Sequence, residues 1–172
     1  MNNVKYIDLK TTLKLMKAEL KRAFPATKFY VRCSRGTGYG WVSLRWTDGP
    51  TYERVTSIAH VYQGSGFDAM TDCSYTIHHV EADENGAPVT SCYGTKGVNC
   101  KREISPAFAR RLLAQVAAYY GDNAPALREY AGYDGTPWWE LVDHKAQIGG
   151  DYWERHMLRA ASDASKYVHT AY

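Results

Sequence analysis

Two apolar periodicities follow one another near the start of the chain, and they constrain its fold more than any other feature. Before Pro25, apolar residues recur at steps of three and four, which predicts an amphipathic helix over about residues 7–23 with its lysines turned outward. Residues 28–33 and 40–46 then alternate apolar and polar side chains, which predicts two strands, each with one apolar face. The apolar helix positions are Leu9, Leu13, Met16, Leu20 and Phe24.

A second helix is predicted after the two strands. The segment 47–50 reads Thr-Asp-Gly-Pro, a turn that can start a helix with proline near its first position. Val55, Ile58, Ala59 and Tyr62 then form the buried stripe of that helix. The fold class is therefore α+β, with an N-terminal α-β-β-α unit built on a small antiparallel sheet. Further strands are predicted over 74–81 and about 98–103, around the turn-rich segment 84–88.

The C-terminal half is predicted to be mainly helical. A serine cap followed by proline at 105–106 begins one helix, which runs to about Tyr120. Asp151 and Glu154 have the spacing of a capping box and predict a last helix whose apolar positions extend to Val168. Between these helices, residues 132–139 predict a tight turn followed by an aromatic anchor.

Length and composition predict one compact domain over residues 1–172, with an α+β part at 1–103 and a helical part at 104–172. The chain has 172 residues, of which 45% are hydrophobic, and no linker divides it. No apolar stretch is long enough to span a bilayer and the first residues lack a secretory core, so we expect a cytoplasmic protein. We expect no cofactor, and a homo-oligomer remains open. The four cysteines are expected to be thiols.

The charges are segregated along the chain, although the formal net charge is only +3. Residues 1–25 hold six Lys or Arg against two acids, and residues 28–60 hold five against two. Residues 61–90 hold five acids and neither Lys nor Arg. The basic first third suits a polyanionic partner, but a solvated outer helix face explains the same pattern.

The outward side of the two strands is the predicted binding surface. Because strand side chains alternate, aromatic rings and guanidinium groups should project together there. Such a face is what the stacking of bases and the pairing of phosphates require. The alternative is that the C-terminal helices cover this face and its aromatic rings belong to the core. The residues assigned to the surface are Tyr30, Arg32, Trp41 and Arg45 on the strands and Arg35 and Tyr39 in the loop between them.

Other motifs are less specific. The glycine-rich segment 34–40 favours a hairpin loop over a phosphate cradle, because a strand and not a helix follows it. Asp68, Asp72, His78 and His79 could act in a small hydrolase or a nucleic-acid-modifying enzyme, the alternative to a binding protein; turn formation explains the two aspartates as well. The spacing of the cysteines and histidines is wrong for a zinc site, so no metal is predicted.

Three segments, 28–36, 42–51 and 67–72, resemble the large polyvalent protein-associated domain, type twenty-nine. The elements Trp-Thr-Asp-Gly-Pro-Thr at 46–51 and Phe-Asp-Ala-Met-Thr-Asp at 67–72 carry the resemblance, which spans about residues 9–80. It implies an α+β protein of phages, prophages or conjugative elements, where neighbouring domains often counter host defences. It supplies no catalytic residues. The expected function is counter-defence (an anti-CRISPR or anti-restriction candidate) or an accessory role, by binding a host defence complex, a nucleic acid or a nucleotide.

Overall fold

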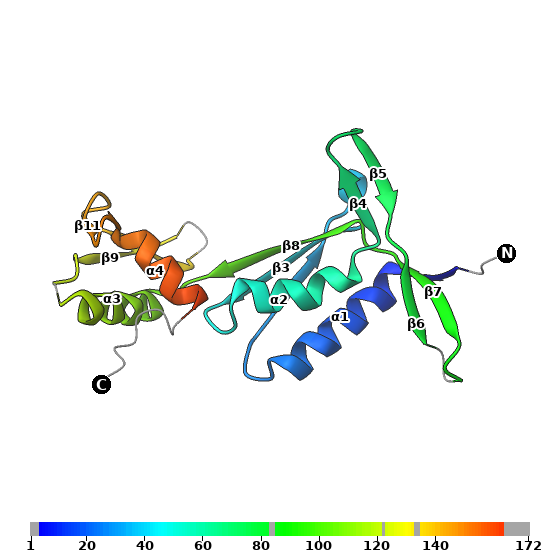
Figure 1. The fold of residues 1–172 in the computed structure, drawn as a ribbon, viewed down its shortest axis with the longest axis horizontal. Coiled ribbons are helices and arrows are strands. Elements are labelled where there is room, and N and C mark those ends of the chain that lie inside the picture. Colours follow the sequence, from blue (N-terminus) through cyan, green and yellow to red (C-terminus); the bar gives the residue numbers. More distant parts are fainter. Residues whose placement is uncertain (1–3, 83–84, 122, 133–134, 164–172) are drawn as a thin grey trace. The chain divides into compact units, whose positions relative to one another are not determined.

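The computed structural model describes residues 4–82, 85–121, 123–132 and 135–163 (Figure 1). These residues form a mixed α+β structure with four α-helices and several small sheets. The chain divides into two compact units, Met1–Lys101 and Arg102–Tyr172. This division lies close to the boundary at 103 that the sequence suggested between its two parts, while a single domain stays a prediction.

The first unit contains most of the strands. Its helices and short helical turns are α1 (Leu9–Ala23), η1 (Gly36–Gly38), α2 (Tyr52–Ala59) and η2 (His60–Tyr62). Its strands are β1 (Lys5–Ile7), β2 (Tyr30–Cys33), β3 (Trp41–Thr47), β4 (Ser65–Asp68), β5 (Cys73–Thr76), β6 (His79–Ala82), β7 (Pro88–Tyr93) and β8 (Gly97–Glu103), the last of which runs across the division. The helix predicted over 7–23 and the two strands that follow it are therefore present, within a few residues of their expected bounds.

Three small sheets arise from these strands. The order β2-β3-β8 forms the sheet that carries the predicted binding surface, with β2 and β3 antiparallel. A second sheet has the order β1-β7-β6, and β4 pairs with β5 as a separate hairpin. The single strand predicted over 74–81 is therefore wrong. Its first part pairs with β4 and its second part with β7, because the chain passes from one sheet to another at Ile77 and His78.

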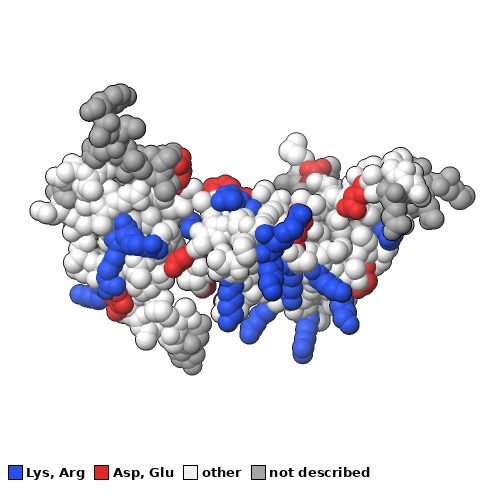
Figure 2. All heavy atoms as spheres, turned by 90° about the horizontal axis from the view of Figure 1, so that it is seen from below, with Lys and Arg blue, Asp and Glu red and all other residues white. Residues whose placement is uncertain are grey.

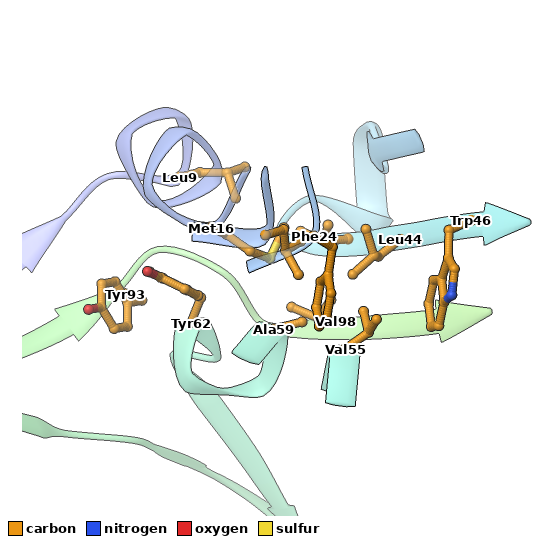
Figure 3. Packing of buried hydrophobic residues seen from close by; sticks show 12 residues of the cluster. Leu9, Met16, Phe24, Leu44, Trp46, Val55, Ala59, Tyr62, Tyr93 and Val98 are labelled. Atoms are coloured by element: carbon orange, nitrogen blue, oxygen red, sulfur yellow. The ribbon is translucent and has the colours of Figure 1, made fainter. Parts of the chain in front are cut away.

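The core of the first unit lies between α1, α2 and the inner face of β2-β3-β8 (Figure 3). Met16 and Leu20 of α1 and Leu44 and Trp46 of β3 are fully buried. The strand alternation predicted from the sequence is therefore confirmed, because Val42, Leu44 and Trp46 all point inward. Burial of such side chains is the main source of stability in a unit of this size.

Side-chain caps begin both helices of the first unit. The carboxylate of Asp8 caps α1 by accepting from the backbone N–H groups of Lys10 and Thr11. Helix α2 is capped by the hydroxyl of Thr51, and Pro50, which was predicted near the first helical position, lies directly before this cap. The carbonyl of Pro50 instead accepts a hydrogen bond from Trp46 Nε1 at 3.0 Å, which satisfies the one polar group of that buried ring.

The second unit contains more strand than the sequence predicted. Its elements are α3 (Pro106–Tyr120), β9 (Leu127–Ala131), β10 (Pro137–Leu141), β11 (Gln147–Ile148), β12 (Asp151–Tyr152) and α4 (Trp153–Ser162). Strands β9 and β10 pair antiparallel, as do β11 and β12. The prediction of a mainly helical C-terminal half is therefore wrong for the described residues, which hold four short strands as well as two helices. Strands this short contain too few residues to show a clear alternation in the sequence. The two helices and these hairpins enclose a core of their own.

The helix ends of the second unit match the sequence at one helix and not at the other. Helix α3 begins after its Ser105 cap and ends before Gly121, whose φ of 67° is left-handed. Helix α4 has no capping box, because Asp151 lies in β12 and its carboxylate accepts from Tyr152 N and pairs with Arg155 and Arg159. The expected stripe positions Ala164 and Val168 lie outside the described residues.

Candidate nucleic-acid interface

The outward side of β2 and β3 carries the aromatic and cationic side chains that the sequence assigned to it. We call Tyr30, Arg32, Trp41, Ser43 and Arg45 the hairpin face. Tyr30 is 51% exposed and Trp41 is 45% exposed, whereas the residues that alternate with them on β3 are buried. Arg32 is exposed and Arg45 is partly buried. The aromatic rings of this face are therefore accessible and do not belong to the core.

The strand register decides which of these side chains are neighbours. Tyr30 lies opposite Arg45 and Arg32 lies opposite Ser43. Lys28 places its Nζ 5.0 Å from the centre of the Tyr30 ring, a cation–π distance. Aromatic and cationic groups therefore alternate across the two strands, and the outward positions of β2 and β3 include no acid.

The loop between the strands holds the other two predicted residues, Arg35 and Tyr39. Gly36 and Gly40 have φ values of 64° and 93°, which confirms a hairpin loop that needs glycine and not a phosphate cradle before a helix. Arg35 is exposed and Tyr39 is 61% exposed. The loop is held to the rest of the unit where Lys96 N donates to the carbonyl of Gly40 at 2.7 Å.

Strand β8 extends this surface in a way that the sequence analysis missed. The indole ring of Trp41 lies against Gly97, since a Cβ built on Gly97 would lie only 2.6 Å from Cζ3 of that ring. Asn99 and Lys101, which alternate with the inward-facing Val98, are exposed on the same side as Gly97. No local pattern could have joined residues 97–101 to residue 41, because the pairing of β8 with β3 is a long-range contact.

An open pocket of about 850 Å³ adjoins Trp41. Trp41 of β3, Tyr52 of α2 and Phe67 of β4 contribute aromatic rings to its wall, and Lys96 and Asn99 contribute a cation and an amide. Tyr52 is held in place by stacking on Trp46 at a ring separation of 6.4 Å. The pocket combines flat apolar surfaces with a few polar groups, the combination that small-molecule and nucleotide sites use.

Comparison with protein families gives a match over the first part of the chain. The model of the large polyvalent protein associated domain 29 matches residues 7–105, which is more than half of the chain. The chain belongs to this family. The match confirms the resemblance seen in the sequence and extends it beyond residue 80 to include β6, β7 and β8. Membership associates the chain with phages and mobile genetic elements. Comparisons with curated proteins and with solved structures find no match.

The residues of the enzyme alternative do not meet in one place. Asp68 and Asp72 lie at the tip of the β4–β5 hairpin, whereas His79 Nε2 lies 3.1 Å from the carbonyl oxygen of Gln63, before β4 begins. At a strand rise of about 3.3 Å per residue, the five residue steps from Gln63 to Asp68 separate these groups by on the order of 15 Å. His78 is exposed and lies between β5 and β6. The four side chains therefore form no common site.

Asp68 stabilises the turn between β4 and β5 by accepting hydrogen bonds within it. Its carboxylate accepts from the backbone N–H of Met70 at 2.9 Å and from the hydroxyl of Thr71 at 2.9 Å. These two hydrogen bonds hold the pKa of Asp68 below its ordinary value, so the group stays ionised at neutral pH. Asp72 has a φ of 53° at the same turn.

The thiols and the remaining titratable groups show no convergent metal site. Within the part of the chain that the structure describes, no three His, Cys, Asp or Glu side chains lie close enough to hold a metal ion. Burial raises the pKa of the Cys100 thiol to about 11, which disfavours the thiolate that nucleophilic chemistry needs. Among the described helices, none has the length and apolar character to cross a membrane.

Two tyrosine–glutamate pairs involve core residues of the first unit. Tyr62 donates to Glu19 of α1, and Tyr93 of β7 donates to Glu81 of β6 at 2.8 Å. The two rings are tilted against each other at 5.2 Å. Burial and then the hydrogen bond to Glu81 raise the pKa of Tyr93 to about 12, and burial also raises the pKa of Tyr62. Both phenols therefore serve as hydrogen-bond donors at neutral pH.

Proposed function

We propose that this chain is a binding protein of a phage or mobile element that takes up single-stranded nucleic acid on the hairpin face. The observation that carries the proposal is the alternation of Tyr30 and Trp41 with Arg32 and Arg45 on the accessible side of a strand pair whose other side packs against the core. The packed reverse side fixes the strand backbone from which the rings and guanidinium groups project. Such rigidity lowers the entropy lost on binding.

Each type of side chain has a distinct part in this mode of binding. Unpaired bases stack on Trp41 and Tyr30, and each stacked base contributes on the order of 1–3 kcal/mol. Arg32, Arg45 and Lys101 pair with the phosphates, which releases counterions and makes the affinity depend on salt. Single strands fit this chemistry better than a duplex does, because stacking on a side chain requires a base that is free of its partner.

The pocket beside Trp41 accommodates one base turned out of the strand. Its volume of about 850 Å³ lies within the range of nucleotide-sized sites. Tyr52 and Phe67 offer further ring surface, and Asn99 offers a donor and an acceptor to a base edge. The residues that line the pocket could bind a free nucleotide in the same way, since it carries the same base and phosphate groups as the strand.

In the setting of its family, such binding would occlude a nucleic acid that a host defence system must reach. The protein would then act as a counter-defence or accessory factor in the cytoplasm of the host bacterial cell. A host defence protein complex is the competing partner. It would use the same rings as a compact hot spot with a weak dependence on salt.

The test is a titration by fluorescence anisotropy with labelled single-stranded DNA and RNA of about 12 nucleotides, a length within the site sizes of single-strand-binding domains. Trp41→Ala should raise Kd by about 5- to 150-fold at each of two salt concentrations, because stacking does not depend on counterions. Arg32→Ala and Arg45→Ala should each reduce the slope of log K against log salt by about 0.7.

Trp138→Ala is the matched control, since Trp138 of β10 is also a half-exposed tryptophan on a strand, with 54% of its surface accessible. Circular dichroism of each variant checks that it is folded. Equal losses in Trp41→Ala and Trp138→Ala, or no binding by the native protein, would refute the proposal. Recovery of a host protein that depends on Trp41 and survives nuclease treatment would assign the hairpin face to a protein partner.

A further inference from the structure

Four lysines form one stripe along helix α1. Lys10, Lys14, Lys17 and Lys21 are all exposed, and we call them the lysine flank. Their spacing of four, three and four residues places them within a sector of about 60° on a helix with 3.6 residues per turn. The stripe is about 16 Å long, because the eleven residues from the first lysine to the last each add about 1.5 Å.

The one acid of α1 lies on another side of the helix from this flank. Met16 and Leu20 turn the apolar side of α1 into the core. Glu19, the one acid within α1, lies on the opposite side of the helix from the lysine flank, about 170° around the axis. There it accepts from Tyr62 and pairs with Arg22 at 3.6 Å. Figure 2 shows Lys and Arg side chains gathered over the region of α1.

The lysine flank is unfavourable for the isolated helix. Like charges at i, i+3 and i, i+4 repel one another. Within the described residues, none of the four ammonium groups forms an ion pair. A polyanion laid along α1 would replace this repulsion with attraction and release counterions. The arrangement therefore favours a partner with a regular row of negative charges over a single small anion.

We propose that the lysine flank binds the phosphate backbone of duplex DNA. Duplex DNA carries one charge per roughly 1.7 Å of its axis, so the flank faces several phosphates at once. Helix α1 contains no aromatic residue, so the stacking that the hairpin face offers to single strands is absent here. A membrane fits poorly, because the apolar side of α1 that would enter the lipid is in the core. The inference does not rest on the proposed function of the hairpin face.

The test measures binding of the full chain to a mixed-sequence DNA duplex of about 24 base pairs over a range of salt concentrations. Replacing all four lysines by glutamine should weaken binding and reduce the slope of log K against log salt by up to about 3.6, or about 0.9 for each phosphate that no longer pairs with a lysine. Replacing the same four residues by arginine keeps the charge and should keep both the affinity and the slope.

A matched pair separates a local effect from one of net charge. Lys14→Gln with Lys17→Gln should weaken duplex binding, whereas Arg111→Gln with Lys145→Gln, two exposed cations of the second unit, should leave it unchanged. Trp41→Ala should leave duplex binding unchanged while it weakens single-strand binding. Equal losses in the two pairs, or no duplex binding by the native protein, would overturn the inference. A four-lysine glutamine variant that loses binding to anionic vesicles but keeps its duplex binding would also overturn it.

Discussion

Replacing Gly97 by alanine should disturb the hairpin face through one ring. The new Cβ would lie 2.6 Å from Cζ3, 3.1 Å from Cε3 and 3.3 Å from Cη2 of Trp41. Carbon atoms in contact prefer separations of about 3.5–4.0 Å, so the indole must move by about 1 Å or leave its rotamer. Such a displacement costs about 0.5–1.5 kcal/mol and misplaces the surface on which a base would stack.

The expected functional loss follows from the value of one stacked base. If the displaced ring loses its base, Kd for a single-stranded oligonucleotide rises by up to the 5- to 150-fold expected for Trp41→Ala, or about 1–3 kcal/mol. A double-mutant cycle isolates this effect. In a Trp41→Ala background, Gly97→Ala should change the affinity little, because the ring that it displaces is already absent.

The assay is the same anisotropy titration, combined with quenching of tryptophan fluorescence by acrylamide. Gly97→Ala should change the quenching of Trp41, one of the two exposed tryptophans among the described residues; a Trp138→Phe background removes the other. Native affinity and native quenching in Gly97→Ala would refute the reasoning, and so would additive losses in the cycle. Additive losses would mean that Gly97 acts through the strand backbone and not through the ring.

Two further predictions concern stability. Leu44→Ala should lower the free energy of unfolding by about 2–5 kcal/mol in urea titrations, because Leu44 is fully buried. Leu15→Ala, at a position that is 42% exposed, should change it by less than about 0.5 kcal/mol, and similar values for the two variants would contradict the strand register. The raised pKa of Tyr93 predicts that its contribution to stability is complete below pH 10 and is lost as the pH rises towards about 12. In urea titrations across this range, the free energy of unfolding of Tyr93→Phe should fall less with rising pH than that of the native protein. The same fall in both proteins would show that ionisation of the Tyr93 phenol does not cause it.

Much of the first unit was predictable because its decisive interactions are local. The three- and four-residue steps of α1 and the alternation on β2 and β3 are properties of consecutive residues. Alternation alone placed Tyr30, Arg32, Trp41 and Arg45 on one side of a hairpin, and the structure confirms that placement. The glycines at 36 and 40 likewise indicated a loop with left-handed residues before any tertiary contact was known.

Other features depend on which strands pair, and the periodicity of one segment does not reveal its pairing partner. The segment 74–81 is divided between two sheets because β5 pairs with β4 and β6 pairs with β7. The strands of the second unit escaped notice because they are short and pair with neighbours whose apolar positions show no clear period. The sequence assigned Asp151 to a helix cap. In the structure Asp151 lies in β12, and its carboxylate forms ion pairs with Arg155 and Arg159.

The candidate site shows the same division. Its aromatic and cationic residues on the hairpin were set by the sequence, because adjacent strands joined by a short loop fix their own register. Its third strand and its pocket were set only by tertiary structure, which brings Gly97 under Trp41 and places Tyr52 and Phe67 beside it. These contacts link residues that are far apart along the chain, and their energy arises from packing that exists only once the whole unit has folded.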